Sequence, residues 1–499
     1  MATRDDHGTY WNATAQSPGF PSLPGDISVD VAIIGGGIVG VTTARLLKDR
    51  GLTVAVIEAR RIGRQVTGKS TAKMSSQHGA SHYQTLEQKF GEERARLYAE
   101  AQEAGIRRIS SLAAEHGIDA DIEPMPSFVY TREESYVSQL EKEVEVAQRL
   151  GLPASLTRDT GLPFDVLQAM RWEGQAQFHP VKYVAGLAAT LPGDGSHVFE
   201  DSRAIDYEPT RVVTERGTVS ARHVVMATHL PLGQVGMYYA TNYPKAEPVI
   251  AAPIRHVPPG MYKNAEEPGH SIRTHRQNGQ VYGIAAGNHY KPGHPEDERE
   301  YLADIERWLT EHFGAGPIEY RWINEDYSPM DGAPFIGWSS KADGYLVATG
   351  FDAWGISNGT VAAEIIADLA TGKENRWLEV FDATRVKPVA GAPDFVKENL
   401  SVAAHLVGGY LGSKAKSYDE LGPGEAAILK IDGDNVAAYR DEGGALHAVS
   451  AVCTHMGCLV GWNQTDKTWD CPCHGSRFEL SGEVIHGPAT KPLGSKITG

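Results

Sequence analysis

Apolar and polar residues first fall into a regular order at Asp30, after a polar, proline-containing lead-in over residues 1–28. Residues 30–34 form a short apolar run, residues 41–50 repeat apolar positions at helical spacing, and residues 52–57 form a second apolar run. Short apolar runs are typical of buried strands, and a period near 3.6 is typical of helices. This order predicts a strand, a helix and a second strand at the start of an α/β domain.

Farther along, two long stretches have helical spacing and two alternate like strands. Residues 84–116 and 133–150 are predicted helices, whereas apolar and polar residues alternate over 249–255 and 271–289. Alternation is the pattern of strands with one buried face. We therefore expect a second, antiparallel sheet, and this sheet is where we expect a substrate to bind.

The pattern changes after Asp382. Residues 386–393 are rich in proline, glycine and alanine, which is typical of a linker, and residues 394–411 have the apolar stripe of an amphipathic helix. Short runs of strand character follow. The predicted domains are an α/β region with two interleaved subdomains over 1–385, a linker and helix over 386–412, and an all-β domain over 413–499.

Length, composition and charge narrow the class of protein. A chain of 499 residues with 41% apolar residues is long enough for two or three domains. The formal charge of −16 is spread along the chain without a basic run, so nucleic acid is not an expected partner. No apolar segment is long enough to cross a bilayer, and the polar N-terminus lacks the apolar part of a signal peptide. We expect a cytoplasmic protein without a membrane span.

The glycines after the first predicted strand have the spacing G-x-G-x-x-G, formed by Gly35, Gly37 and Gly40. In dinucleotide-binding folds the first glycine allows a tight turn, the second lets the backbone approach a pyrophosphate, and the third packs the helix on the strand. Glu58 ends the second predicted strand, where a carboxylate can accept hydrogen bonds from ribose hydroxyls. Both FAD and NAD fit this pattern, and so does a glycine-rich turn in another kind of α/β domain.

All four cysteines lie in one window near the C-terminus. The window reads Cys453-Thr-His455-Met-Gly-Cys458 and, twelve residues later, Cys471-Pro-Cys473-His474-Gly-Ser476. Two thiolates and two imidazoles are enough ligands for one metal centre, and a Cys2His2 zinc site is one candidate.

This window resembles the Rieske [2Fe–2S] motif at every fixed position, which favours an iron–sulfur cluster over zinc. The resemblance implies that Cys453 and Cys471 hold one iron and that His455 and His474 hold the other. It also implies a disulfide between Cys458 and Cys473 beside the cluster. Ser476 corresponds to a residue whose hydroxyl bonds a cluster sulfur in that family.

The first 385 residues resemble the D-amino-acid oxidase superfamily of flavoproteins, and within it the amine-oxidising branch that includes γ-glutamylputrescine oxidoreductase. The segments that carry the resemblance are residues 30–58, 67–73, 222–228, 329–337 and 350–359. The resemblance favours FAD over NAD. Together with the glycine spacing it predicts these cofactor-binding residues: Gly35, Gly37, Gly40, Glu58, Ser70, Thr71, Lys73, Gly350, Phe351, Trp354 and Gly355. It also implies that a helix N-terminus points at the flavin.

Three residues are candidates for catalysis or substrate binding. His289 and Tyr290 end a predicted strand of the substrate sheet, and Arg321 precedes the segment that lines the flavin ring in the family. Tyr327 and Trp354 are further candidates for the pocket wall, although aromatic residues beside apolar neighbours are usually core residues.

Together the two cofactors predict a redox enzyme. A flavin exchanges two electrons and a [2Fe–2S] cluster exchanges one, so the expected reaction is oxidation of an amine or amino-acid-like substrate by hydride transfer to the flavin. The cluster then relays electrons to an external acceptor protein. One alternative is electron entry at the cluster, with the flavin reducing or hydroxylating a substrate. Another alternative is a redox relay or sensor without small-molecule turnover.

Overall fold

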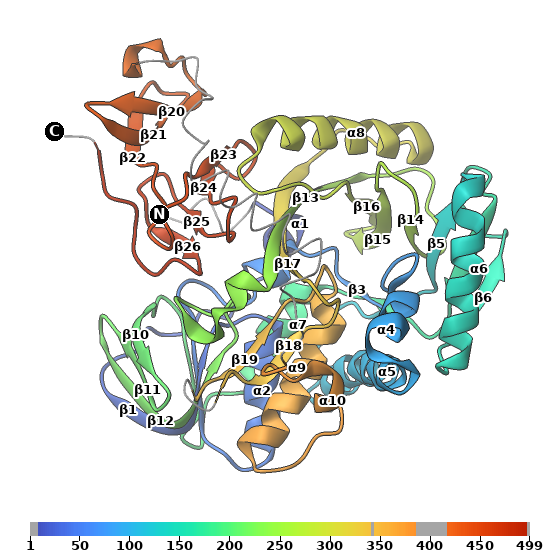
Figure 1. The fold of residues 1–499 in the computed structure, drawn as a ribbon, viewed down its shortest axis with the longest axis horizontal. Helices are drawn as coiled ribbons and strands as arrows, with labels where there is room; N and C mark the ends of the chain where they lie inside the picture. Colours follow the sequence, from blue (N-terminus) through green and yellow to red (C-terminus); the bar gives the residue numbers. More distant parts are fainter. Residues whose placement is uncertain (1–7, 341–343, 386–416, 497–499) are drawn as a thin grey trace.

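The computed structural model describes residues 8–340, 344–385 and 417–496 (Figure 1). The predicted linker at 386–393 and the amphipathic helix at 394–411 lie outside these residues. The rest of the chain folds into two large sheets with helices around them, followed by two small sheets near the C-terminus. Within the described residues, no helix has the length and apolarity required to cross a membrane.

The first large sheet contains the predicted strand–helix–strand unit. Its central strands β1 (Ile27–Ile34), β2 (Val54–Ile57) and β12 (Gly217–Met226) are parallel. The other strands are β9 (His197–Phe199), β10 (Ala204–Glu208), β11 (Arg211–Thr214), β18 (Phe335–Trp338) and β19 (Leu346–Thr349). Helix α2 (Ile38–Asp49) packs between α7 (Pro180–Ala189) and α9 (Gly355–Ala370). The C-terminal half of β1 is buried, so the glycine loop that follows it begins in the interior of the protein.

The second large sheet is mostly antiparallel, as the alternating stretches predict. Its strand order is β17 (Tyr320–Pro329), β13 (Asn242–Pro253), β16 (Gln280–Ala286), β15 (Ser271–Gln277), β14 (Met261–Asn264), β5 (Ser127–Thr131), β7 (Gln168–Trp172) and β6 (Ala154–Thr157). Helix α8 (Pro295–Phe313) packs against β13 and β16. A small third sheet joins β3 (Lys73–Met74), β8 (Ala176–Gln177) and β4 (Glu123–Pro124).

The helical prediction for residues 84–116 needs one correction. The structure has two helices there, α4 (His82–Phe90) and α5 (Glu92–Glu115), because Gly91 has a φ of +85° and interrupts the helix. Such a φ lies outside the helical region and suits glycine. The second predicted helix is α6 (Glu134–Arg149), and the remaining short helices are α1 (Tyr10–Thr14), α3 (Val66–Lys69), α10 (Leu378–Phe381), η2 (Val235–Ala240) and η4 (Tyr418–Glu420).

The C-terminal region is an all-β domain. One antiparallel sheet contains β20 (Ala426–Ile431), β21 (Asp434–Arg440) and β22 (Leu446–Ser450). The other contains β23 (Gly461–Asn463), β24 (Thr468–Asp470), β25 (Arg477–Phe478) and β26 (Val484–His486). In Figure 1 this domain, coloured orange to red, lies above the first sheet and beside one end of α8. Its second sheet faces the rest of the protein, which places the cysteine window at the contact between the two regions.

Candidate functional site

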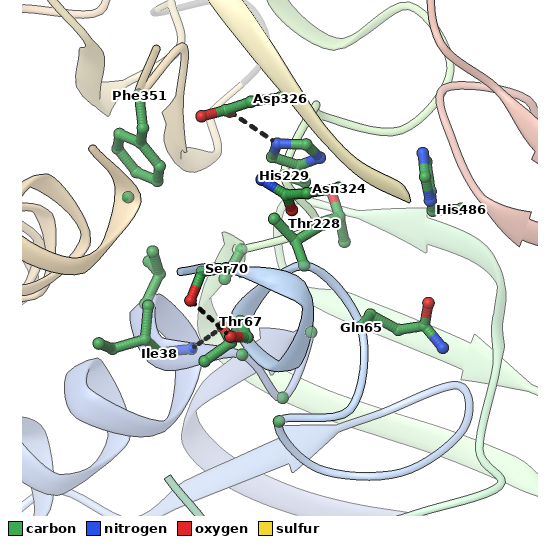
Figure 2. Close-up of a pocket in the computed structure, with 18 of the residues that line it drawn as sticks. Ile38, Gln65, Thr67, Ser70, Thr228, His229, Asn324, Asp326, Phe351 and His486 are labelled. Atoms are coloured by element: carbon green, nitrogen blue, oxygen red, sulfur yellow. Dashed lines mark hydrogen bonds and ion pairs between the residues drawn. The ribbon is translucent and has the colours of Figure 1, made fainter. Parts of the chain in front are cut away.

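The glycine loop forms one end of a large pocket. Gly35 and Gly37 line this pocket, and α2 begins at Ile38 with its first turn toward it. The Ile38 N–H donates to the Thr67 hydroxyl oxygen over 3.1 Å (Figure 2). A Cβ on Gly40 would lie 2.0 Å from the Gly35 carbonyl oxygen, so this glycine permits the close contact of helix and strand. Gly37, at the N-cap position, has no side chain to cap the helix, so the N-terminal N–H groups beyond Ile38 can bind a pyrophosphate.

Glu58 lies at the adjacent wall and is buried. Its carboxylate accepts hydrogen bonds from the Gly36 N–H and the Arg60 N–H, each over 2.8 Å. Burial raises the pKa of Glu58, although the two N–H groups oppose that shift. Arg203 lines the same part of the pocket, and it is a residue that no sequence pattern indicates. This arrangement fits a dinucleotide whose ribose hydroxyls lie at a fixed carboxylate.

Two further segments line the pocket. Ser70 and Thr71 line it from the loop between α3 and β3 and Lys73 from the start of β3, while Phe351, Trp354 and Gly355 line it at the start of α9. Helix α9 also has no side-chain cap, so its N-terminal N–H groups can stabilise negative charge on a bound ring. Gly350 does not line the pocket. It packs against Asn242 with a φ of +77°, where a Cβ would lie 2.4 Å from the amide oxygen.

Charged side chains line the part of the pocket formed by the antiparallel sheet. Lys73, Glu247 on β13 and Lys263 on β14 are half-buried residues of the pocket wall, which also includes the more exposed His289. Burial raises the pKa of Glu247 to about 7 and lowers that of Lys73 to about 7. Desolvation, with Lys245 and Lys263 nearby, lowers the pKa of His289 to about 3, so this imidazole is neutral. Such a wall can attract both an ammonium and an anionic group.

His229 and Asp326 form a pair beside this charged wall, since Asp326 lies on β17, the strand paired with β13. The His229 Nε2 atom lies 2.9 Å from the Asp326 carboxylate, and His229, which lines the pocket, has a φ of +68°. Figure 2 shows this pair beside Asn324, across from Thr67 and Ile38, with His486 farther along the wall. Asn324 and Asp326 come from β17, a strand for which the sequence predicts Arg321 as the functional residue.

The C-terminal domain supplies the remaining wall. Residues 484–487, 489 and 490 line the same pocket as the glycine loop. The Val484 carbonyl oxygen accepts a 2.7 Å hydrogen bond from Arg203, and the Gly233 N–H donates to the Pro488 carbonyl oxygen over 3.0 Å. Nothing in the sequence indicates this contact, because its two sides are more than 200 residues apart.

The cysteine window folds into two adjacent loops of the same domain. Cys453 and Cys471 are buried free thiols within hydrogen-bonding reach of each other. The His455 and His474 rings lie beside them, with centroids 5.0 Å apart and planes nearly perpendicular. The buried Nδ1 atom of His455 has no hydrogen-bond partner among the described residues. Two thiols and two imidazoles, one with an unpartnered nitrogen, fit the ligand set of a [2Fe–2S] cluster.

The other two cysteines form a disulfide. Cys458 and Cys473 are joined, and their sulfur atoms lie within 4.8 Å of the Cys471 sulfur. The Ser476 hydroxyl is in hydrogen-bonding reach of Cys453, and its oxygen also accepts the Ala489 N–H over 3.0 Å. The disulfide therefore connects the two loops, and Ser476 connects them to the segment that reaches the pocket.

A buried ion-pair network holds the C-terminal domain against β17. Arg477 is 2% exposed, and its guanidinium lies 2.8 to 2.9 Å from the carboxylates of Asp466, Asp470 and Glu325. Glu325 is 3% exposed and lies 2.8 Å from His486. Lys69, beside the pocket, lies 2.5 Å from Asp466. Charges buried this deeply persist only when paired, so the two regions are fixed together here.

The structure does not bring all three candidate catalytic residues together. His289 lines the pocket, but Tyr290 packs against Ala246 and Ile323 outside it. Arg321 is 43% exposed, and its guanidinium binds Glu306 of α8. Side chains alternate along β17, so Asn324 and Asp326 face the pocket while Arg321 faces away.

Comparisons with known proteins agree with this geometry. Residues 30–369 match the family model "FAD dependent oxidoreductase", and residues 413–496 match "Rieske [2Fe-2S] domain". YhfW of Bacillus subtilis (strain 168), named as a Rieske 2Fe-2S iron-sulfur protein, is 36% identical over 492 residues, covering 97% of this chain and 96% of that protein.

More distant relatives match about three quarters of the chain. Gamma-glutamylputrescine oxidoreductase of Escherichia coli (strain K12) is 24% identical over 402 residues, covering 74% of this chain and 90% of that protein. The L-proline dehydrogenase structure from P. horikoshii has a TM-score of 0.59 at 20% identity, covering 73% of this chain and 98% of that one. At that identity the structural likeness supports the fold alone.

Proposed function

We propose that this protein is an amine or amino-acid dehydrogenase whose electrons leave through an iron–sulfur cluster. The chain belongs to the family of FAD-dependent oxidoreductases and carries a Rieske [2Fe–2S] domain, and these two facts are the basis of the proposal. The division into an oxidoreductase region (1–385) and a Rieske region (413–499) is part of this proposal. So is the assignment of Cys453, His455, Cys471 and His474 as the cluster ligands.

One observation carries the proposal: the pocket of the oxidoreductase region is closed by a loop of the Rieske domain. Residues 484–490 pack on one side against the pocket and on the other against Ser476, whose hydroxyl reaches Cys453. A cluster beside the pocket can exchange electrons with a flavin without a separate carrier.

Bound FAD supplies a two-electron acceptor for a C–H bond next to an amine, and the cluster supplies a one-electron carrier. The chain's own side chains bind and orient the substrate. Glu247 can attract an ammonium, and Lys263 can attract an acidic group on the same molecule. Neutral His289 borders the same space. The name of one relative supports this substrate class, since gamma-glutamylputrescine oxidoreductase is named for an amine substrate.

Anaerobic mixing of the holoenzyme with a panel of secondary amines and amino acids tests the proposal. The expected result is bleaching of the flavin absorbance followed by the EPR signal of a reduced Rieske cluster. Cys453→Ser is the matched variant, because it removes one cluster ligand and should leave flavin bleaching without that signal. If every amine left both centres oxidised while chemical reduction of the cluster reduced the flavin, electrons would flow in the opposite direction and the dehydrogenase assignment would be wrong.

A further inference from the structure

Strand β17 separates the flavin pocket from the Rieske domain, and its two faces have different partners. Asn324 and Asp326 line the pocket. Glu325 and Tyr327 point the other way: Glu325 pairs with Arg477, and Tyr327 reaches the loop of His474. Because successive side chains of a strand point to opposite faces, one short segment contacts both redox sites.

Tyr327 makes the most direct connection across this wall. Its buried hydroxyl donates a 3.0 Å hydrogen bond to the backbone carbonyl of His474, a proposed cluster ligand. A Cβ on Gly475 would lie 2.6 Å from the same hydroxyl, so the two regions are in tight contact here.

The other end of Tyr327 reaches the pocket in two ways. Its ring packs edge-on against His229, a pocket residue, with centroids 4.6 Å apart. Its carbonyl oxygen accepts the Asp352 N–H over 3.0 Å, and the neighbours Phe351 and Ala353 line the pocket. Tyr327 therefore links the pocket wall to the loop of a proposed cluster ligand, through a ring contact and a backbone hydrogen bond on the pocket side and one hydrogen bond on the cluster side.

Two other aromatic residues near the proposed cluster ligands do not connect the pocket wall with those ligands. Tyr239 touches both His455 and His474, but it is not part of the pocket wall. His486 lines the pocket, yet its ring centroid is 6.1 Å from that of His229, and its Nε2 atom lies 2.8 Å from Glu325 rather than beside a proposed cluster ligand.

We propose that Tyr327 is the positioning residue that couples the flavin pocket to the cluster, an inference that rests on the proposed function. In each transfer the reduced flavin loses one electron and the oxidised cluster gains one. The tyrosine is neither oxidised nor deprotonated, and it acts by holding His474 at a fixed contact with the pocket wall. The proton released by the flavin leaves on the pocket side and does not pass through Tyr327.

The test compares three variants of the full-length holoenzyme. Tyr327→Phe keeps the ring and removes the hydrogen bond, whereas Tyr327→Leu also removes the ring. Tyr238→Phe is the control, because Tyr238 is also buried but its hydroxyl donates to the Ala383 carbonyl and not to the backbone of a proposed cluster ligand. A laser flash generates a one-electron reductant in solution, which reduces one of the two centres. The absorbances of the flavin and the cluster are then followed while the electron moves between the two centres. Redox titration of both centres and the EPR spectrum of the cluster are recorded for each protein.

Redistribution should be several-fold slower in Tyr327→Phe and slower again in Tyr327→Leu, with both midpoint potentials, the EPR spectrum and the amine-driven bleaching of the flavin unchanged. Tyr238→Phe should behave like the wild type. The inference is overturned if both Tyr327 variants redistribute the electron at the wild-type rate. It is also overturned if the rate falls only with a shift in cluster potential, or falls equally in the control. A wild-type protein that showed no redistribution at all would refute the proposed function itself.

Discussion

Replacing Arg477 by leucine should strongly destabilise the Rieske domain and its contact with β17. The guanidinium is 2% exposed and is the cation shared by the carboxylates of Glu325, Asp466 and Asp470. Removing one partner of a buried ion pair costs about 3 to 5 kcal/mol. A domain has roughly 5 to 15 kcal/mol of stability in total, so the variant should lose a large part of it.

The loss should depend on pH in a defined direction. Burial already raises the pKa of Asp470, and Arg477 opposes that shift, so its removal raises the pKa further. A carboxyl group with a raised folded-state pKa binds more protons in the folded than in the unfolded state, and this makes stability rise as pH falls. The difference in the free energy of unfolding between the wild type and Arg477→Leu should therefore be largest near neutral pH and should become smaller toward about pH 5.

Urea unfolding of the holoenzyme measures the free energy of unfolding at each pH, with the visible absorbance of the cluster as the probe of the Rieske domain. Arg440→Leu is the control, because the Arg440 guanidinium binds only the carbonyl oxygens of Tyr418, Leu421 and Gly444 among the described residues. It should lower stability by the same amount at every pH. The reasoning fails if the deficit of Arg477→Leu is no larger than that of the control, or if it does not change with pH.

Three other outcomes are expected. Glu58→Leu should lower the flavin content of the purified protein, because it removes the carboxylate proposed to bind the ribose. It also leaves two N–H groups unpaired, at a cost of about 1 to 3 kcal/mol. The molar ratio of flavin to protein measures the flavin content. The KM for an amine should fall as pH rises through about 7, where Glu247 loses its proton and gains charge while Lys73 loses its charge. Glu247→Gln should flatten this dependence, and an unchanged profile would exclude Glu247 from substrate binding. Replacing Cys458 and Cys473 together by serine should lower the stability of the Rieske domain by about 3 kcal/mol, the value for a loop of this length, as measured by calorimetry; no change would show that the disulfide does not constrain the unfolded chain.

Local spacing explains which parts of the site could be predicted. Gly35, Gly37 and Glu58 belong to one strand–helix–strand unit, where short-range geometry determines which residues meet a pyrophosphate and a ribose. The prediction for Arg321 had no such support. The sequence shows that Arg321 lies near Asn324 in the chain, but it does not show which face of β17 meets the pocket. That depends on the partner strand β13 and on the helix and the domain that pack against β17.

The sequence by itself determined the two cofactor families, the order of the two regions and the antiparallel character of the second sheet, because each is encoded in residues that are close along the chain. Tertiary structure alone decided that a loop of the Rieske domain closes the flavin pocket. It also decided that the two faces of β17 have different partners, with Asp326 lining the pocket and Tyr327 bonding the His474 carbonyl. These contacts join residues that are far apart in the sequence, 147 positions for Tyr327 and His474, and only the packing of complete domains brings such residues together.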